Sequence, residues 1–422
     1  MLKNKIKILH LYYLLIGIIL ITKYEFILDS LKFGMDMLKL LSRNFTAFKA
    51  LLNFSVLEIL ISLFFLLLII VSPPLSKKFR KILNLKLTLV SFLLSVLLLF
   101  ALLTPVTATF NPNQIRNIGE TKLLPPLSMF YAVKLKDKSG SFDEITGIRK
   151  EGENLINHGI TNSTILVKNI QIDNNNIKLN TKSGTKIYRK DEVESVNTKL
   201  FLFGTDEYGR DIFSRIIYGT RLAFVIGLGS VFVSVLVGIS LGIFAGFVKG
   251  FFDSVSNRIA EMFLAFPFLF LIILIIALFG NSVFVIILVL GISGWMSLFK
   301  IIRNEIINLS ERDFIITSKN LGISKTKIFF KEMFPVIISP IIVNLVLQFG
   351  NVIMAESALS YLGLGVSEDY SSWGSMINAG QYYLTNAWWM SLFPSLFLFF
   401  VLYSANKLGH NLEKIFNPLT SK

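Results

Sequence analysis

The stretch from Ser310 to Pro335, SERDFIITSKNLGISKTKIFFKEMFP, is a charged interval between two long apolar segments of the chain. Ser310 precedes Asp313 by three residues, and this spacing predicts a capping box that begins a helix. Leu321-Gly322 then predicts a left-handed exit from that helix, because glycine adopts positive φ without steric cost. The interval is therefore expected to contain a helix that ends in a sharp turn at Gly322.

A second helix is predicted directly after the turn. Ser324 is expected to cap it, and Pro335 to mark the boundary of the following apolar segment. At the bend, a side chain in place of Gly322 would obstruct either the backbone or a docking partner. A helix, turn and helix of this kind is an element that another protein can grip, although an ordinary amphipathic loop uses the same cap and turn residues.

The composition places the chain in a membrane. Hydrophobic residues make up 53% of the chain, and the mean hydropathy is +0.64. Apolar runs of about 20 residues match a bilayer core about 30 Å thick, which excludes a soluble globular protein. The net charge of +15 comes from basic residues clustered beside these runs, so lipid is an expected partner and nucleic acid is not. Cysteine is absent and the three histidines (His10, His158 and His410) are scattered, so neither a disulfide nor a metal cluster is predicted.

Eight membrane spans are predicted from the apolar runs. They lie at about residues 8 to 22, 54 to 72, 87 to 106, 222 to 247, 259 to 279, 283 to 302, 336 to 356 and 388 to 406. The chain accordingly divides into extra N-terminal spans with a basic loop (1–86), a first core span (87–106), an insertion (107–200) and a core (201–422) that contains the loop 303–335. Within the fifth span, Leu264-Ala265-Phe266-Pro267 places a proline where the lost hydrogen bond permits a kink.

Basic residues predict the orientation of these spans. Lysines precede the first span and a basic loop separates the second from the third, so both regions are expected in the cytoplasm. The residues concerned are Lys3, Lys5, Lys7, Lys77, Lys78, Arg80, Lys81 and Lys86. Counting onward places residues 107–221 outside, and 303–335 and both termini inside. The first span is predicted to be an uncleaved anchor rather than a signal peptide, because no small-residue cleavage site follows it.

The insertion differs in character from the spans. Its early prolines give way to residues 165–193, ILVKNIQIDNNNIKLNTKSGTKIYRKDEV, in which apolar and polar residues alternate between turn residues. This pattern predicts two or three short β-strands in a small extracytoplasmic subdomain. Two roles remain open, contact with a delivery protein or a spacer. The sequon at Asn162 carries little weight, because such triplets occur often by chance.

A second informative segment, Phe203 to Arg215, reads FGTDEYGRDIFSR and precedes the fourth span. Asp206, Arg210, Asp211 and Arg215 recur near helical spacing, which predicts a short interfacial helix at the outer surface, held by ion pairs. Within the span that follows, small residues recur at every fourth position. They are Ser230, Ser234, Gly238, Gly242 and Gly246, and they predict close packing against another helix.

The charged loop resembles the EAA loop of ABC importer permeases, the cytoplasmic element that a nucleotide-hydrolysing subunit receives in a surface groove. The matching residues are Glu311-Arg312-Asp313-Phe314, Leu321-Gly322-Ile323-Ser324, Ile328-Phe329-Phe330-Lys331 and Phe334-Pro335. The Glu-Ala-Ala that names the motif reads Ile316-Thr317-Ser318 here. The resemblance implies that the loop contacts the ATPase through Glu311, Asp313, Phe314, Leu321, Gly322, Ile323, Ser324, Lys325, Phe334 and Pro335. Lys319 and Lys327, with Lys325, form a charged rim or serve membrane orientation.

The outer segment is more specific. GTDEYGRD followed by SRIIYGTR resembles the signature of the dipeptide, oligopeptide and nickel subfamily of these permeases, in its C-type subunit. The signature residues are Gly204, Thr205, Asp206, Gly209, Arg210 and Asp211. The resemblance continues through AESALSYLGLG (355–365), SWG (372–374), AWW (387–389) and LFP (392–394). His410 and Asn417 stand where the family usually has aspartates, and Trp388 and Trp389 are expected in an outer interfacial belt.

The resemblance implies an all-α polytopic protein with the type I ABC importer transmembrane fold and a small extracytoplasmic β insertion. Such a permease works in the cytoplasmic (inner) membrane with a second homologous permease, two ABC ATPase subunits and an extracytoplasmic binding protein. ATP and magnesium would bind to the ATPase subunits, because this chain lacks a G-x-x-x-x-G-K-[ST] phosphate cradle and is not expected to be an enzyme. Oligopeptides or dipeptides are the expected substrates, and nickel chelates, glutathione or another small solute remain open.

Two rival classes have less support in the sequence. An ion-coupled transporter needs ionisable groups near the bilayer midplane, yet the carboxylates of the spans, Glu58, Glu261 and Glu356, lie near span ends. Glu356 is a possible pathway or gate residue, or a carboxylate held by neighbouring backbone donors. A membrane enzyme has no clustered catalytic residues to support it.

Overall fold

The structure is a computed structural model. It describes residues 14–71, 89–115, 118–136, 144–161, 163–173, 175–182, 184–248, 250–265, 267–367 and 369–416. The chain forms two compact units. One contains Met1–Arg221 with Asp369–Phe397, and the other contains Leu222–Glu368 with Leu398–Lys422. These units combine segments that are distant in the chain, so they do not test the predicted domain boundaries, which stay predictions.

The first unit begins with helices. Residues 14–22 are helical, and α2 (Tyr24–Arg43), α3 (Phe45–Leu51), α4 (Phe54–Val71), α6 (Leu89–Leu102) and α7 (Thr104–Thr107) follow. Residues of the first helix, α4, α6 and α7 share one buried core, which includes Ile19, Leu66 and Leu99. A second core joins α2, α3 and α4 to α9 (Glu144–Ile156), where Gly152 lies against the ring of Phe33. The N-terminal helices are thus packed together rather than isolated.

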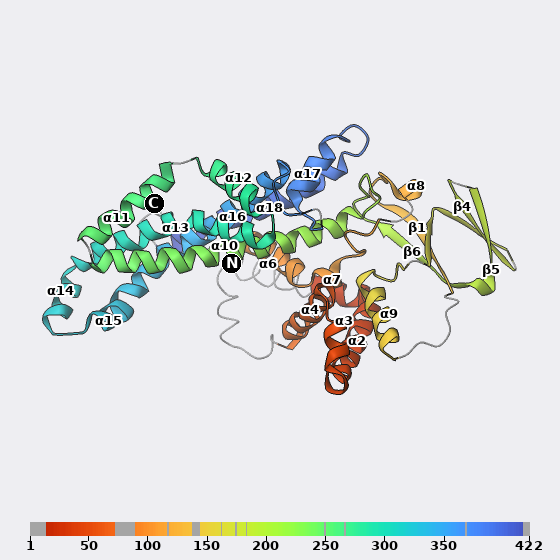
Figure 1. The fold of residues 1–422 in the computed structure, drawn as a ribbon, viewed down its shortest axis with the longest axis horizontal. Coiled ribbons are helices and arrows are strands. Elements are labelled where there is room, and N and C mark those ends of the chain that lie inside the picture. Colours follow the sequence, from red (N-terminus) through yellow and green to blue (C-terminus); the bar gives the residue numbers. More distant parts are fainter. Residues whose placement is uncertain are drawn as a thin grey trace. The chain divides into compact units, whose positions relative to one another are not determined.

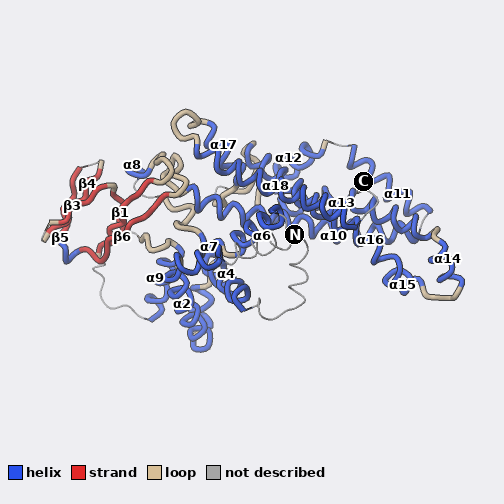
Figure 2. The backbone as a smooth tube through the Cα atoms, turned by 180° about the vertical axis from the view of Figure 1, so that it is seen from behind, coloured by secondary structure: helices blue, strands red, loops and turns tan. Residues whose placement is uncertain are grey.

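The insertion holds more strands than its sequence predicts. One antiparallel sheet has the order β2-β1-β6, and the other has the order β3-β4-β5 (Figure 2). The strands are β1 (Ser128–Leu135), β2 (Thr164–Val167), β3 (Asn169–Ile172), β4 (Asn176–Thr181), β5 (Gly184–Arg189) and β6 (Val193–Phe201). Buried Val133, Val167, Ile177 and Leu179 form a core between the sheets. The sequence missed β1 because SMFYAVKL follows a proline-rich segment and pairs only with distant strands.

The first unit also contains three short elements. They are α8 (Ile118–Thr121), η1 (Lys190–Glu192) and α17 (Trp373–Gln381). The first ten residues of α10 (Ile212–Val248) and the first nine of α18 (Trp389–Phe416) also belong to the first unit.

The second unit is helical (Figure 1). It contains the rest of α10 and α18, with α11 (Gly250–Ala265), α12 (Phe268–Phe279), α13 (Val283–Ser310), α14 (Asp313–Asn320), α15 (Lys325–Ile328), the π-helical turn η2 (Phe329–Met333) and α16 (Phe334–Tyr361). The α10 stripe of small residues packs against α13. Ser230 and Ser234 donate to the carbonyl oxygens of Ile287 and Gly291, at 3.1 and 2.7 Å.

Four described helices are long and apolar enough to cross a membrane: Ile212–Val248, Val283–Ser310, Lys325–Tyr361 and Trp389–Lys414. They contain the predicted spans 222–247, 283–302, 336–356 and all but the first residue of 388–406. The predicted span 259–279 is not one straight helix, because α11 and α12 meet at an angle of 91°. Pro267 begins the turn into α12, where its missing N–H removes the hydrogen bond that would continue α11.

The N-terminal spans also differ from their prediction. The helix of span 54–72 forms an angle of 94° with α3. Span 87–106 holds α6 and the short helix α7, and the apolar helix Phe92–Leu102 is shorter than the four helices long enough to cross a membrane. Residues 1–13, which contain part of the first predicted span, lie outside the described residues. The sequence missed α2 because its charged residues interrupt the apolar run.

Candidate functional site

The predicted loop contains the two short helices α14 and α15, but it does not begin with a capping box. Ser310 is the last residue of α13, and its hydroxyl donates to the carbonyl oxygen of Ile306 at 2.6 Å. The sequence prediction is wrong because α13 continues for about two turns beyond the predicted span 283–302. Arg312, with extended backbone, is the N-cap of α14, and Asp313 lies in the first turn, where a carboxylate favours the helix dipole.

The turn at Gly322 is as predicted. Its φ is +75°, and its N–H donates to the carbonyl oxygen of Lys319 at 3.0 Å. A Cβ at position 322 would meet no atom within 4 Å, so a side chain would not obstruct the chain itself. The structural constraint is the backbone angle, and contact with a partner stays a prediction. Ser324 is the N-cap of α15, although its side chain makes no capping hydrogen bond.

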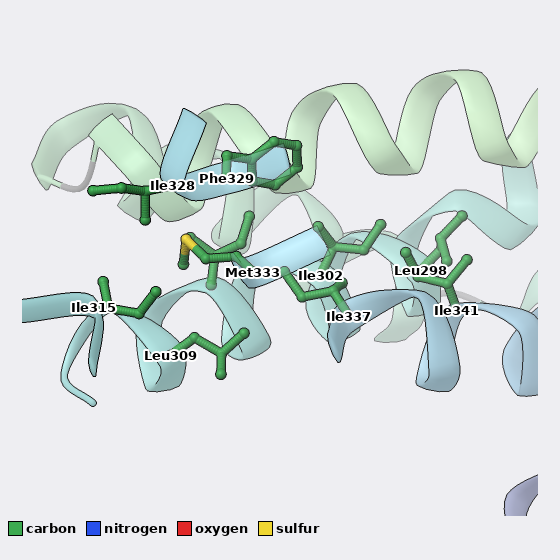
Figure 3. Close-up of a cluster of buried hydrophobic side chains, with 10 residues drawn as sticks. Leu298, Ile302, Leu309, Ile315, Ile328, Phe329, Met333, Ile337 and Ile341 are labelled. Atoms are coloured by element: carbon green, nitrogen blue, oxygen red, sulfur yellow. The ribbon is translucent and has the colours of Figure 1, made fainter. Parts of the chain in front are cut away.

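A buried apolar cluster fixes the loop to the ends of α13 and α16. Figure 3 shows Ile315 of α14 beside Leu309, and Ile328 and Met333 above them. Each of these side chains is buried. The loop is therefore a packed structure and not a flexible connection, because these groups exclude water on folding.

The loop also exposes large apolar side chains. Phe314, Ile316, Leu321 and Phe330 are 49%, 43%, 74% and 62% exposed. Solvent contact with four such groups is unfavourable, and exposed apolar side chains gathered in one segment can mark an interaction surface. We call these four residues the loop face.

Helices α15, η2 and α16 run on without a break as one long helix, Lys325–Tyr361. Pro335 nonetheless lies at the predicted boundary, because α16 begins at Phe334. Pro335 lies in the first turn of α16, directly after the π-helical turn, whose wider hydrogen-bonding pattern accommodates the missing proline N–H. Within η2, the carboxylate of Glu332 accepts from the hydroxyl of Ser318 at 2.8 and 2.9 Å. The sequence did not predict this brace between η2 and α14.

The other predicted loop residues have mixed environments. Glu311, Asp313, Ser324, Lys325 and Pro335 are exposed, whereas Ile323 and Phe334 are half-buried against the loop cluster. The structure thus assigns Ile323 and Phe334 to holding the loop together. Contact of any of these residues with an ATPase stays a prediction.

The outer signature is not the predicted interfacial helix. Residues 204–211 form a loop with positive φ at Gly204 and Gly209 (+78° and +77°), and α10 begins only at Ile212. A Cβ at Gly204 would lie 2.4 Å from the carbonyl oxygen of Leu124, and one at Gly209 would lie 2.2 Å from Oγ1 of Thr121. The helix prediction failed because ion pairs at a spacing of four also form across a tight turn.

Asp206 organises this loop. Its carboxylate accepts from the backbone N–H groups of Tyr208 and Arg210, both at 2.9 Å, and from Nε of Arg210 at 2.7 Å. The guanidinium of Arg215 also donates to it. Asp206 is only 3% exposed, so these are buried, charge-assisted bonds. The predicted ion pairs therefore exist, but they close a loop.

Asp211 is the cap of α10. Its Oδ2 accepts from the N–H of Ser214 at 2.8 Å and from the hydroxyl of Thr109 at 3.0 Å. Burial raises the pKa of Asp211 to about 6, although these hydrogen bonds and the charge of Lys23 act in the opposite direction. Burial also lowers the pKa of Lys23 to about 8. The N-terminal helices and the signature loop thus share a buried polar cluster that the sequence did not reveal.

Two tryptophans complete the outer site. The indole of Trp389 donates to the carbonyl oxygen of Thr205 at 3.1 Å, and that of Trp373 donates to the carbonyl oxygen of Ile216 at 3.2 Å. Both side chains are buried, so the expectation that Trp389 lies in an interfacial belt is wrong. Trp388 is exposed, and its place in an outer interfacial belt stays a prediction.

The packing stripe places Gly238, Gly242 and Gly246 against α13. A Cβ at any of the three would lie 2.9 Å from an atom of that helix. Ser234 also accepts from the amide of Gln348, at 2.5 Å, which joins α16 to the same seam. The prediction of close helix packing at these positions agrees with this geometry.

Glu356 is buried near the end of α16. Its carboxylate accepts from the hydroxyls of Ser360 and Ser357, at 2.7 and 3.4 Å. The sequence suggested that backbone donors hold the Glu356 carboxylate, and the structure shows serine hydroxyls donating to it. A role of Glu356 as a gate stays a prediction. Among the described residues, no group of three or more His, Cys, Asp or Glu could hold a metal ion.

Some predictions fall on residues that the structure does not describe. They concern Lys3, Lys5, Lys7, Lys77, Lys78, Arg80, Lys81, Lys86, Asn162, Phe266 and Asn417. The orientation argument from the basic loop therefore rests on the sequence alone.

Comparisons with known proteins agree with this geometry. Residues 238–422 match the family described as binding-protein-dependent transport system inner membrane component. The dipeptide permease DppC of Bacillus subtilis is 35% identical over 217 residues, which cover 51% of this chain and 68% of DppC. The oligopeptide permease OppC of Escherichia coli K12 is 36% identical, over 51% of this chain and 72% of OppC. A structure of the MetNI methionine ABC transporter gives a TM-score of 0.38 at 12% identity, over 47% of this chain and 96% of that chain, too weak a likeness to inform the site.

Proposed function

The chain belongs to the family of binding-protein-dependent inner membrane transport components, among the dipeptide and oligopeptide ABC permeases, and on this premise we propose that it imports peptides. It is a multi-pass permease subunit of an ABC importer. Peptides are the substrates named for its relatives, and they are the substrate class proposed for this chain. Oligopeptides or dipeptides would reach it from an extracytoplasmic binding protein.

The observation that carries this function is the loop face beside the Gly322 turn. A rigid loop that presents four apolar side chains can transmit force to a partner, because the buried cluster beneath it resists deformation. In the proposed mechanism, closure of two ATPase subunits moves this loop. The loop then moves α13 and α16, and the path opens to one side of the membrane and then to the other.

The remaining partners complete the assembly. A second homologous permease would line the path with this chain, and ATP with magnesium would bind to the two ATPase subunits. Both termini and the loop 303–335 would lie in the cytoplasm, as the basic residues predict. A reporter at Lys150 that reacted only from the cytoplasmic side would contradict this orientation.

Substitution of Gly322→Arg tests the coupling. The variant is expected to insert into the membrane but to lose ATPase co-purification and peptide uptake, because arginine strains the positive φ and projects into open space where the partner docks. Gly363→Arg is the matched control, since Gly363 also has positive φ (+78°) and open space but lies outside the loop. Wild-type uptake by Gly322→Arg, or equal losses in both variants, would contradict the proposed coupling.

The substrate requires its own measurement. The permease complex, reconstituted in vesicles with its binding protein, is expected to accumulate labelled dipeptides or oligopeptides only when ATP is supplied. Uptake that continued without ATP and collapsed with the proton gradient would overturn the ABC mechanism. ATP-driven uptake of a nickel chelate in place of peptides would retain the mechanism and correct the substrate.

A further inference from the structure

A cavity of about 130 Å³ lies between the charged loop and the ends of two membrane spans. Its lining residues are Gly246, Phe247, Ser310, Lys319, Lys325, Ile328 and Met333. They come from α10, α13, α14, α15 and η2, all within one compact unit. None of the four residues of the loop face lines it, although Lys325 is also among the residues that the family resemblance assigns to the ATPase contact.

The cavity lining combines apolar side chains with two lysines. Phe247, Ile328 and Met333 supply hydrocarbon, and Figure 3 shows Ile328 and Met333 on the same side of the buried cluster. Nζ of Lys319 lies 3.4 Å from the carbonyl oxygen of Ser310, so the ammonium group lies beside another residue of the cavity lining. Among the described residues, neither Lys319 nor Lys325 forms an ion pair, so their charge is available to an anion.

The position of the cavity indicates what fills it. Gly246 and Phe247 lie in the last turn of α10, and Ser310 is the last residue of α13. The predicted span 222–247 ends at Phe247, so this side of the cavity is expected at the level of the lipid headgroups, whereas Ser310 lies eight residues beyond the predicted span 283–302. Basic pockets at the ends of membrane helices on the cytoplasmic side bind acidic headgroups.

We propose that this cavity binds the headgroup of an acidic phospholipid, with the phosphate at Lys319 and Lys325 and the adjoining carbons against Phe247, Ile328 and Met333. The volume suits part of one lipid, since an apolar cavity of about 150 Å³ holds a molecule the size of benzene. A bound lipid would connect the charged loop to the membrane surface, so acidic lipid would stiffen the element that moves during transport.

Lipid retention by the purified chain tests the site. The chain is extracted from bilayers of phosphatidylcholine with added phosphatidylglycerol, and retained phosphatidylglycerol is measured by mass spectrometry. The double variant Lys319→Gln with Lys325→Gln is expected to bind phosphatidylglycerol about thirty-fold more weakly, from the usual contribution of two lysines at an acidic surface. The matched control is Lys327→Gln with Lys331→Gln, which removes two exposed lysines of the same loop that do not line the cavity.

The outcomes separate lipid from other ligands. Selective loss in the first double variant supports the proposal, and equal loss in both variants overturns it in favour of general charge attraction. Displacement of phosphatidylglycerol by inorganic phosphate would show that the site takes a free anion, which also overturns it. Unchanged lipid retention with lost ATPase association would assign the cavity to a protein partner instead. The retention measurement needs neither ATPase nor peptide, so its failure is distinct from failure of the proposed function.

Discussion

The outer signature loop and the inner charged loop turn their side chains in opposite directions. The outer loop folds its charged groups inward, onto the buried carboxylate of Asp206. The inner loop buries Ile315 and Ile328 but turns Phe314 and Leu321 outward. Both stretches resemble family motifs, yet the first is fastened internally, whereas the second exposes apolar side chains that we propose as a docking surface. A motif therefore identifies a family without showing whether its residues serve stability or recognition.

The largest effect is expected at the fastening. Asp206→Ala would leave the guanidinium groups of Arg210 and Arg215 without their carboxylate, and breaking a buried ion pair costs about 3–5 kcal/mol. Thermal unfolding of the purified chain is expected to show this as a large fall in midpoint. Asp191→Ala is the control, because it removes a pair with Arg189 in which both side chains are mostly exposed, worth about 0–1 kcal/mol. Similar unfolding midpoints for the two variants would show that the ion pairs of Asp206 do not fasten the outer loop.

The next effect should appear in binding rather than stability. Phe314→Ala with Leu321→Ala is expected to weaken ATPase association by about 2 kcal/mol, because buried apolar anchors dominate interfaces, while the unfolding midpoint stays unchanged. Leu362→Ala is the matched control, since Leu362 is 59% exposed but lies outside the loop. Titration of the permease with its ATPase measures the difference. A fall in stability without a change in affinity would make the loop face structural.

The sequence predicted those features that depend on one local residue. Gly322 has the positive φ that its place after a helix requires, and the small residues of α10 meet α13 as their spacing predicts. Local patterns did not distinguish a helix from a loop around Asp206, because an ion pair between residues four apart occurs in both. The two glycines of that motif, Gly204 and Gly209, carried the information that the charge spacing concealed.

Contacts between distant segments were beyond prediction. The hydroxyl of Ser318 donates to Glu332, 14 residues further along the chain, and the indole of Trp389 donates to Thr205, 184 residues earlier in the chain. Each pairing depends on how several helices pack, and a single sequence contains no measure of that packing. Glu332, a single acid that follows three lysines in the sequence, was nevertheless a visible sign of a specific contact.

A pH profile would sharpen the contrast at the outer loop. Burial raises the pKa of Asp211 from 3.8 to about 6, so between these values the folded chain binds more protons than the unfolded chain. Stability from this group is therefore full below about pH 4 and is lost as the pH rises through about 6. Asp211→Asn, which still caps α10, is expected to gain in midpoint over the native chain across that interval and to keep a constant advantage above it. A difference that does not change with pH would contradict this assignment.

The smallest effect concerns the seam between α10 and α13, which in the proposed mechanism would carry motion from the inner loop. A Cβ at Gly238 would lie 2.9 Å from the carbonyl oxygen of Trp295, so Gly238→Ala must push the helices apart, at a cost of about 1 kcal/mol. Gly350→Ala is the matched control, because its Cβ would meet Ala405 at an ordinary 3.4 Å and alanine favours the helix. Unfolding midpoints should fall for the first variant and hold or rise for the second. If both midpoints rose, the close approach of α10 and α13 would be a looser contact, and the inner loop would need another route to move the core.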